Sequence, residues 1–259
     1  MTLCRTIDLG ISFGGVQAIE ALDLRVHRGE IVALIGPNGA GKTTVLNCLS
    51  GFYLPDRGRV ELDGLNLRRF SPARRAQLGI GRTFQTPQVF RSLTVEEHLD
   101  LAFALGRSFL GHRRLRRRSE GGRPAEDDIG RLIDATGLAE HAATLAGALP
   151  LGLARRLEVA RALALAPRLL LLDEPASGME EHESRNLGEL ILNLRDSPGM
   201  GILLVEHDMG LVGQVADYVY VLDHGRLLAA GDLARVRQNP EVIRAYLGGE
   251  ARRESLAVG

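Results

Sequence analysis

The chain has 259 residues, 45% of them hydrophobic, which allows one large globular domain or two modest ones. Its 32 Lys and Arg residues balance 32 Asp and Glu residues, so the charge gives no reason to expect a nucleic-acid partner. No apolar run is long enough to cross a bilayer, and Cys4 and Cys48 match no metal-binding spacing, which predicts reduced thiols in a cytosolic protein.

Short β-rich stretches dominate the first part of the chain. Residues 2–9, 18–27 and 58–63 predict strands separated by turn signals. These strands predict an antiparallel β patch, and the apolar residues 30–35 predict a buried parallel strand. Phe13 lies just before the first turn, where it is either a core residue or a flat face for a purine ring.

A glycine-rich loop follows the buried strand and leads into a helix that is closed by Gly51. It matches G-x-x-x-x-G-K-[ST], the phosphate-binding loop, in which backbone N–H groups, Lys42 and the Thr43 hydroxyl face phosphates and Mg²⁺. A glycine-rich turn that binds nothing is disfavoured, because strand, loop and helix occur in the required order. The predicted nucleotide-binding residues are Gly36, Pro37, Asn38, Gly39, Ala40, Gly41, Lys42, Thr43 and Thr44.

The middle of the chain is mostly helical. Residues 72–83 predict a helix, and a capping box at Thr94 opens another that runs to about residue 105. Strong helix formers predict two more helices, at about 126–137 and 151–165. Residues 89–157 therefore predict a helical block inserted between two parts of an α/β core, residues 1–88 and 158–259.

A basic segment changes the character of residues 106–128. We interpret the basic run 112–118 as part of a solvated, mobile loop, with attraction to anionic lipid head groups as the weaker alternative. Nucleic acid is disfavoured as its ligand because no aromatic residues are interleaved. At the end of the chain, residues 249–259 predict a disordered tail.

The α/β pattern returns after the helical block. Residues 168–174 and 202–208 predict buried strands with polar tips, separated by a helix at about 183–195. Residues 218–222 and 226–230 predict a hairpin. The predicted fold class is α/β, with a P-loop NTPase core built on a parallel sheet, an N-terminal antiparallel β patch and an inserted helical subdomain.

Polar residues stand where ligands of a parallel sheet bind, at the carboxyl ends of its strands. Two consecutive carboxylates, Asp173 and Glu174, are costly to bury without a cation. We interpret Asp173 as a Mg²⁺ ligand through water and Glu174 as the base for the attacking water, with a helix N-cap pair as the alternative. His207 lies at the next strand tip, and Gln85 links the core to the helical block.

In order and spacing, these motifs resemble those of the ATP-binding subunits of ABC transporters over almost the whole chain. The resemblance implies an ATPase in which Glu174, His207 and Gln85 are catalytic and Phe13 stacks on adenine. Thr43, Gln85 and Asp173 are the implied Mg²⁺ ligands. Ser177–Glu180 loosely matches the family's D-loop. The segments 12–15, 47–53, 82–88, 205–209 and 239–248 resemble the subgroup that imports branched-chain or other hydrophobic amino acids, with importers of urea or amides as the alternative.

The resemblance also implies an assembly. Two ATPase subunits sandwich two ATP molecules and drive two polytopic membrane subunits at the cytoplasmic face of the inner membrane, peripherally bound. A solute-binding protein takes part indirectly, and no nucleic acid is expected. The helical block would dock on the membrane subunits, with the segment after Gln85 at the contact.

One motif departs from the family pattern. Leu149, Pro150, Leu151, Gly152 and Leu153 stand where the family has its Leu-Ser-Gly-Gly-Gln signature, which faces the ATP of the other subunit. Proline has neither the hydroxyl nor the N–H that a serine would offer a phosphate. We therefore expect a paralogous ATPase partner, although a homodimer stays open. Two alternatives remain: a nucleotide-gated subunit that hydrolyses weakly, and a soluble ABC protein acting on DNA or ribosomes.

Overall fold

The computed structural model describes residues 1–110, 126–195 and 199–246. The basic run 112–118 and the predicted tail 249–259 lie outside the described residues. None of the helices within the described ranges is long and apolar enough to span a membrane.

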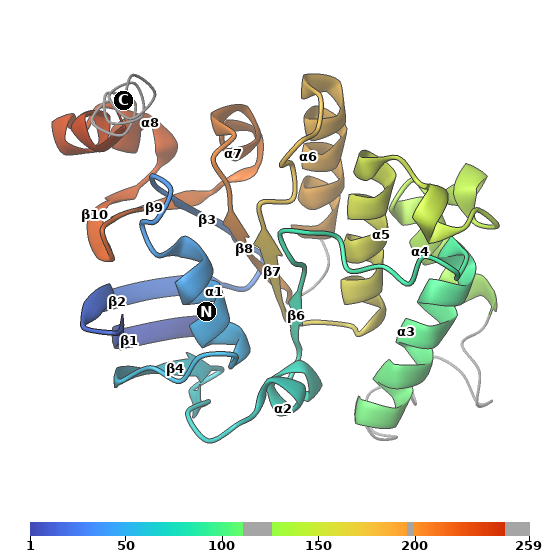
Figure 1. The fold of residues 1–259 in the computed structure, drawn as a ribbon, viewed down its shortest axis with the longest axis horizontal. Helices are drawn as coiled ribbons and strands as arrows, with labels where there is room; N and C mark the ends of the chain where they lie inside the picture. The colour runs from blue at the N-terminus through green and yellow to red at the C-terminus, as the bar shows by residue number, and fades with distance from the viewer. Residues whose placement is uncertain (111–125, 196–198, 247–259) are drawn as a thin grey trace.

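The strands form two sheets that lie side by side in the core (Figure 1). Their bounds are β1 Thr2–Phe13, β2 Val16–His27, β3 Ile31–Ile35, β4 Arg57–Leu62, β5 Leu65–Asn66, β6 Ile80–Arg82, β7 Leu169–Asp173, β8 Gly201–Val205, β9 Tyr218–Asp223 and β10 Arg226–Gly231. The first sheet is antiparallel, with the order β2-β1-β4-β5. The second has the order β10-β9-β3-β8-β7-β6, and only β10 runs antiparallel to its neighbour. These sheets confirm the predicted α/β class, and β9 with β10 confirms the predicted hairpin.

Helices cover both faces of the second sheet. Their bounds are α1 Lys42–Ser50, α2 Pro72–Gln77, α3 Val95–Leu110, α4 Glu126–Ala135, α5 Leu151–Ala164, α6 Glu181–Arg195, α7 Met209–Val215 and α8 Leu233–Arg237, with 3-10 turns at Ala139–His141 and Ala146–Ala148. Alternate residues of β7 face opposite layers, as expected for a strand buried on both sides. Leu169 and Leu171 pack with α1 and the antiparallel sheet, whereas Leu170 and Leu172 pack with α5, α6 and α7.

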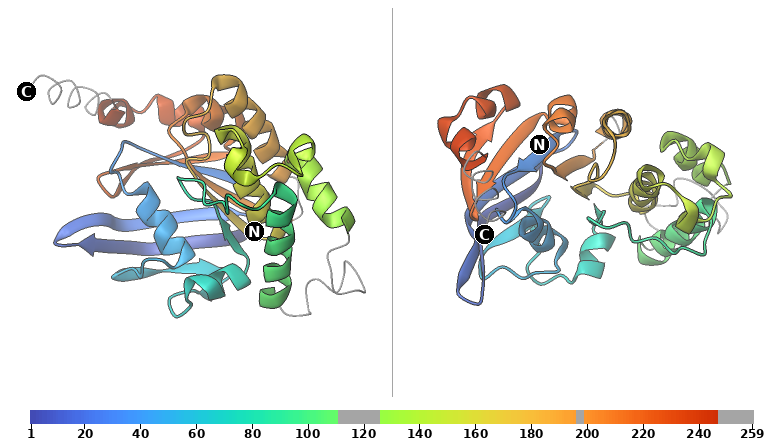
Figure 2. Two further views of the ribbon diagram at one scale, coloured as in Figure 1. Left: turned by 45° about the vertical axis from the view of Figure 1, so that its right-hand side comes forward. Right: turned by 45° about the horizontal axis from the view of Figure 1, so that its top comes forward.

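The helical region has a core of its own. Helices α3, α4 and α5 share buried residues such as Val95, Ile133 and Leu157. All views place α3 and α4 at the opposite end of the molecule from β10 and α8 (Figure 2). The division into a core and a helical block at 89–157 stays a proposal. Helix α5 runs unbroken across its second boundary, because Val159 and Ala162 pack against the second sheet.

The capping box at the start of α3 forms as predicted. The backbone N–H of Thr94 donates to Glu97 Oε2 at 2.8 Å, and the backbone N–H of Glu97 donates to Thr94 Oγ1 at 3.2 Å. The helix runs to Leu110, beyond the predicted end near residue 105 and into the segment predicted to be a loop. Strand β1 likewise extends to Phe13 rather than ending at residue 9.

The helix predicted over residues 72–83 is wrong in its second half. Helix α2 ends at Gln77, and Gly79 follows with φ 101°, a left-handed conformation that stops a helix. Residues Ile80–Arg82 then form β6, which pairs in parallel with β7. This short edge strand brings the following Gln85 to the carboxyl ends of the central strands.

Candidate nucleotide-binding site

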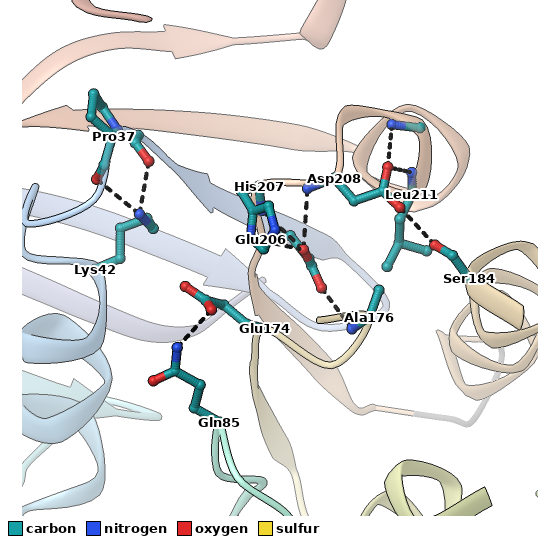
Figure 3. A network of polar contacts seen from close by, with 12 residues as sticks. Pro37, Lys42, Gln85, Glu174, Ala176, Ser184, Glu206, His207, Asp208 and Leu211 are labelled. Atoms are coloured by element: carbon teal, nitrogen blue, oxygen red, sulfur yellow. Dashed lines mark hydrogen bonds and ion pairs between the residues drawn. The ribbon is translucent and has the colours of Figure 1, made fainter. Parts of the chain in front are cut away.

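The phosphate-binding loop connects β3 to α1 and folds over its own lysine. Lys42 is the first residue of α1 and is buried. Its Nζ donates to the carbonyl oxygens of Gly36, at 2.7 Å, and of Pro37, at 3.0 Å (Figure 3). Asn38, Gly39 and Thr43 are exposed, whereas Ala40 is buried and Thr44 partly buried. The loop therefore presents one open surface above an enclosed ammonium group.

Two of the loop glycines are required by close backbone contacts. A Cβ on Gly36 would lie 2.1 Å from the Leu222 carbonyl oxygen. A Cβ on Gly41 would lie 2.6 Å from the carbonyl oxygen of Ala18. Gly39 has open space around it but takes φ 83°, which favours glycine. The loop is thus wedged between β2 and β9, which fixes the direction of its N–H groups.

Three carboxylates stabilise the charged form of the Lys42 side chain. Burial lowers the pKa of Lys42, and Glu174, Asp173 and Glu206 oppose this effect by raising it. These carboxylates come from the carboxyl ends of β7 and β8; β8 pairs with β3, and β7 is the next strand in the second sheet. The phosphate-binding loop and the carboxylates of Asp173 and Glu174 therefore lie at the same edge of the sheet.

Asp173 ends β7 and is 1% exposed. Its Oδ2 accepts a hydrogen bond of 3.1 Å from Arg82 Nη2, in a buried ion pair. Its Oδ1 is buried and makes no hydrogen bond to any residue in the described ranges. Burial raises the pKa of Asp173, while Arg82 and the nearby Thr43 hydroxyl lower it. One oxygen of this carboxylate is therefore paired with Arg82, and the Thr43 hydroxyl is the other neighbour that favours its charged form.

Arg82 is a residue whose role the sequence did not indicate. Its guanidinium also donates to Asn47 Oδ1 and Ser50 Oγ, both at 2.7 Å, at the end of α1. It lies over the rings of Phe52 and Phe84, with its Cζ 5.7 and 5.0 Å from their centroids. Arg82 thus joins the helix that follows the phosphate loop to the carboxylate at the end of β7.

Glu174 and Gln85 contact each other directly. Gln85 Nε2 donates to Glu174 Oε2 at 2.8 Å (Figure 3). Glu174 takes φ 46°, an uncommon backbone conformation for a residue with a side chain. The next helix, α6, begins only at Glu181, so Asp173 and Glu174 are not the helix N-cap pair considered as an alternative.

His207 follows β8 and is exposed, with its Nδ1 3.8 Å from Glu206 Oε2. The preceding Glu206 is fully buried, and the following Asp208 caps α7 by accepting the N–H groups of Gly210 and Leu211. The structure therefore places His207 at the strand tip, as predicted, between two residues that are held firmly.

Comparison with known proteins shows which family this chain belongs to. Residues 19–177 match the family described as ABC transporter, and residues 226–252 match the one described as branched-chain amino acid ATP-binding cassette transporter. The chain belongs to the ABC transporter family. Like others of its kind, this ABC subunit is an ATPase with a nucleotide-binding cassette fold.

Similar relatives and structures span nearly the whole ABC cassette. The high-affinity branched-chain amino acid transport ATP-binding protein LivG of Escherichia coli is 43% identical over 246 residues, covering 93% of this chain and 95% of LivG. BraF of Pseudomonas aeruginosa, of the same description, is 41% identical over 248 residues, covering 93% and 95%. The ADP conformation of MJ1267, an ATP-binding cassette of an ABC transporter, has a TM-score of 0.82 at 29% identity, covering 96% and 99%.

Phe13 lies at the tip of β1 and is not a core residue of this ABC subunit. The residue is 45% exposed, and its ring packs edge-on against Tyr53, with the centroids 5.1 Å apart. An exposed ring is available for stacking, which leaves the adenine-binding prediction as a proposal.

The segment that departs from the ABC signature, residues 149–153, lies at the start of α5. Pro150 is the N-cap residue and Leu151, 42% exposed, begins the helix. A Cβ on Gly178 would lie 2.9 Å from Leu151 Cδ2, and one on Gly152 would lie 2.6 Å from Glu183 Oε1. The signature therefore borders the segment that follows Glu174 in the chain, with Leu149 and Leu153 turned partly into the helical core.

Helix α5 also holds the backbone around Gln85. Arg155 donates to the carbonyl oxygens of Phe84, at 2.9 Å, and of Gln85. Glu158 accepts the N–H of Gln88 at 2.9 Å, and Arg161 donates to the Gln88 carbonyl oxygen. Arg155, Glu158 and Arg161 are spaced three residues apart, so the sequence could predict that they share one face of α5. It could not predict that this face contacts the backbone around Gln85.

Proposed function

We propose that this chain is the motor subunit of an importer for branched-chain or other hydrophobic amino acids, and that it binds ATP with Mg²⁺ and hydrolyses it. The observation that carries the proposal is the convergence of Lys42, Asp173 and Glu174 beside an open phosphate-binding loop. Nucleotide phosphates would lie against the loop N–H groups and the Lys42 ammonium, which would exchange its two carbonyl partners for phosphate oxygens.

The residues at the loop fit Mg²⁺. Among the described residues no cluster of three or more His, Cys, Asp or Glu side chains could hold a metal by itself. Mg²⁺ suits such a site, because it keeps several waters and binds through one or two carboxylates and substrate phosphates. Thr43, Gln85 and Asp173 would hold it, and Asp173 Oδ1 is a buried oxygen close to the Thr43 hydroxyl that makes no direct hydrogen bond of its own within the described ranges. Bound there, Mg²⁺ would neutralise phosphate charge.

Glu174 and Gln85 would orient the attacking water. Glu174 would act as the general base, within hydrogen-bond reach of a water beyond the phosphate loop. Gln85 already bonds one of its oxygens, which fixes the carboxylate and leaves the other oxygen to accept a proton. His207, exposed at the adjacent strand tip, would contact the terminal phosphate.

The solute class rests on relatives. LivG and BraF are named as branched-chain amino acid transport proteins, and the match over residues 226–252 carries the same description. Importers of urea or amides remain the alternative. Import also requires two polytopic membrane subunits and, indirectly, a solute-binding protein, which would place this subunit peripherally at the cytoplasmic face of the inner membrane. No nucleic acid partner is proposed.

A groove next to the site suits a membrane subunit. A cavity of about 410 Å³ lies between the core and the helical region. Apolar side chains such as Phe52, Phe84, Phe90 and Leu101 line it, together with Arg82. Phe52 and Phe90 are exposed, as an interaction surface requires. Because Phe84 and Arg82 adjoin Gln85 and Asp173, an occupant of the groove would contact the residues that hold the site.

The departure of residues 149–153 from the family signature supports a paralogous ATPase as the partner subunit. Two copies of this chain would pair two signatures that contain Pro150, whereas a paralogue can supply an intact one to the site described above. The partner's own ATP, facing Pro150 and Leu151, would turn over slowly. Restoring the family residues with Pro150→Ser, Leu151→Gly and Leu153→Gln should raise the ATPase rate of the assembled transporter. An unchanged rate and unchanged ATP-driven dimerisation would refute the asymmetry.

Glu174→Gln tests the proposed function. In a motor this variant should bind ATP, trap it and lose most turnover of the assembled transporter. A nucleotide-gated subunit that barely hydrolyses ATP would be hardly affected. Recovery of nucleic acid but no membrane protein with the tagged chain would instead revive the soluble class of ABC protein.

A further inference from the structure

Glu206 is a buried carboxylate for which the proposed mechanism has no use. It directly follows β8 and is 0% exposed. Its Oε1 accepts the N–H of Ala176 at 2.8 Å, and its Oε2 accepts the N–H groups of His207, at 2.9 Å, and Asp208, at 3.2 Å (Figure 3). One side chain thereby ties the loop after β7 to the loop after β8.

The loop after β7 is the one that carries Glu174 in an unfavourable backbone conformation. A left-handed conformation is unfavourable for a residue with a Cβ and persists where its surroundings hold it. Two hydrogen bonds from the tip of β8 bracket this residue. The Glu174 N–H donates to the Val205 carbonyl oxygen at 2.9 Å, and two residues later Ala176 donates to Glu206. Pro175, between them, has no N–H to contribute.

We propose that Glu206 is a positioning residue for hydrolysis, which holds the backbone of Glu174 and of His207 in one fixed relation. The inference deepens the proposed function and rests on it. Glu206 holds Glu174 through the N–H of Ala176, and it holds His207 through the N–H of His207 itself. The proposed base and the proposed phosphate contact therefore share one anchor, although they come from different strands.

The chemistry of the anchor requires a carboxylate. All three protein partners are N–H donors, and both oxygens of Glu206 are occupied as acceptors. A glutamine at this place would turn one acceptor into an NH₂ group facing an N–H donor. Because the site is fully buried, no water replaces the lost bond, so one loop must move. Burial lowers the pKa of Lys42 and of Arg155, and the Glu206 carboxylate is among the groups that oppose this effect, which places it close to the phosphate loop and to α5.

A purely structural role for Glu206 predicts different results. Loss of a structural bond would lower stability and weaken ATP binding and turnover together. Loss of a positioning bond would lower kcat and leave KM nearly unchanged, because the phosphate loop makes none of these contacts. A misplacement of about 1 Å suffices for a loss of about 100-fold in rate.

Glu206→Gln in the assembled transporter tests the proposal, with the exposed Glu189→Gln on α6 as the matched control. We expect kcat to fall at least about tenfold while KM and the Kd for ATP stay within about threefold. The control should behave as wild type. Unchanged kcat, or equal losses in kcat and ATP affinity, would overturn the proposal.

The double variant Glu174→Gln/Glu206→Gln separates this proposal from the proposed function. If Glu206 acts through Glu174, single-turnover hydrolysis in the Glu174→Gln background should fall less than about threefold on adding Glu206→Gln. Because Glu206 also holds His207, a small residual loss is expected, but a further loss as large as in wild type would overturn the positioning of Glu174. If Glu174→Gln alone retained wild-type turnover, the proposed function would fail instead.

Amide hydrogen exchange gives a measurement that does not depend on activity. Glu206→Gln should speed exchange at the amides of Ala176, His207 and Asp208, while that of Val45 in α1 stays unchanged. Glu206→Asp keeps the charge but is one methylene shorter, and should show the same local effect even if the glutamine variant folds poorly. An equal change in exchange rate at all four amides, or no change at any of them, would contradict the proposal.

Discussion

The Gln85 side-chain amide donates a hydrogen bond of 2.8 Å to Glu174 Oε2, although 89 positions separate the two residues in the chain. Different elements hold each end of this contact. Arg155 of α5 bonds the Gln85 carbonyl oxygen, and the end of β8 bonds the Glu174 N–H. The alignment of the proposed catalytic carboxylate therefore depends on α5 as well as on the central sheet.

Arg155→Met should impair hydrolysis through Gln85. The variant removes the donor to the Phe84 and Gln85 carbonyl oxygens, so we expect kcat to fall about tenfold with KM for ATP little changed. Steady-state ATPase of the assembled transporter measures both constants. Arg156→Met is the control, because this neighbour bonds the Thr136 carbonyl oxygen instead. Equal losses in the two variants would contradict a specific role for Arg155.

Arg82→Met should destabilise the fold. Removing one partner of a buried ion pair leaves Asp173 uncompensated and costs about 3–5 kcal/mol of unfolding free energy. Arg59→Met is the comparison. The Arg59 side chain is 45% exposed in its ion pair with Glu61, so its loss should lower the unfolding free energy by less than about 1 kcal/mol. Urea denaturation of the isolated chain measures both. A smaller loss for Arg82→Met than for Arg59→Met would show that Asp173 does not depend on its partner.

Alanine substitutions in the phosphate loop should differ by position. Gly36→Ala places a Cβ 2.1 Å from a backbone oxygen, so the loop must shift and ATP binding should be lost. Gly39→Ala meets open space and costs only the strain of its positive φ, roughly 1–2 kcal/mol. Titration with a fluorescent ATP analogue compares the two. Equal affinities would indicate that the loop geometry is not what binds phosphate.

The two cysteines should be unreactive in the folded chain. Burial raises the pKa of Cys4 to about 12 and that of Cys48 to about 11. At pH 8 a thiol reagent should label neither until denaturant is added, and should then label both. Stability should also fall as the pH rises from the ordinary thiol value of 9.0 towards 12, because unfolded thiols ionise first. Rapid labelling of the native chain at pH 8 would contradict the described packing.

Local patterns were sufficient to predict the class of fold and the motifs of the site. The strand before Gly36, the hairpin after Tyr218 and the capping box at Thr94 depend on neighbouring residues, so the sequence shows them directly. The strand at residues 80–82 could not be predicted, because three residues carry no periodicity and their pairing with β7 is a tertiary contact. The same reason hid Arg82 and Glu206, whose partners lie far away in the chain. The only sequence signal for Glu206 was a charged residue at the end of a predicted buried strand, and Arg82 lay in a segment predicted to be helical.

Binding of ATP by wild type and by Lys42→Ala tests the central claim most directly. Lys42 is the only lysine in the 259-residue sequence, so no second lysine can take its place. With Mg²⁺ present, calorimetry should show that the wild-type chain binds ATP and that the variant binds it at least about tenfold more weakly, as expected for lost charge-assisted hydrogen bonds. Failure of the wild-type chain to bind ATP, or equal affinity in the variant, would contradict the account.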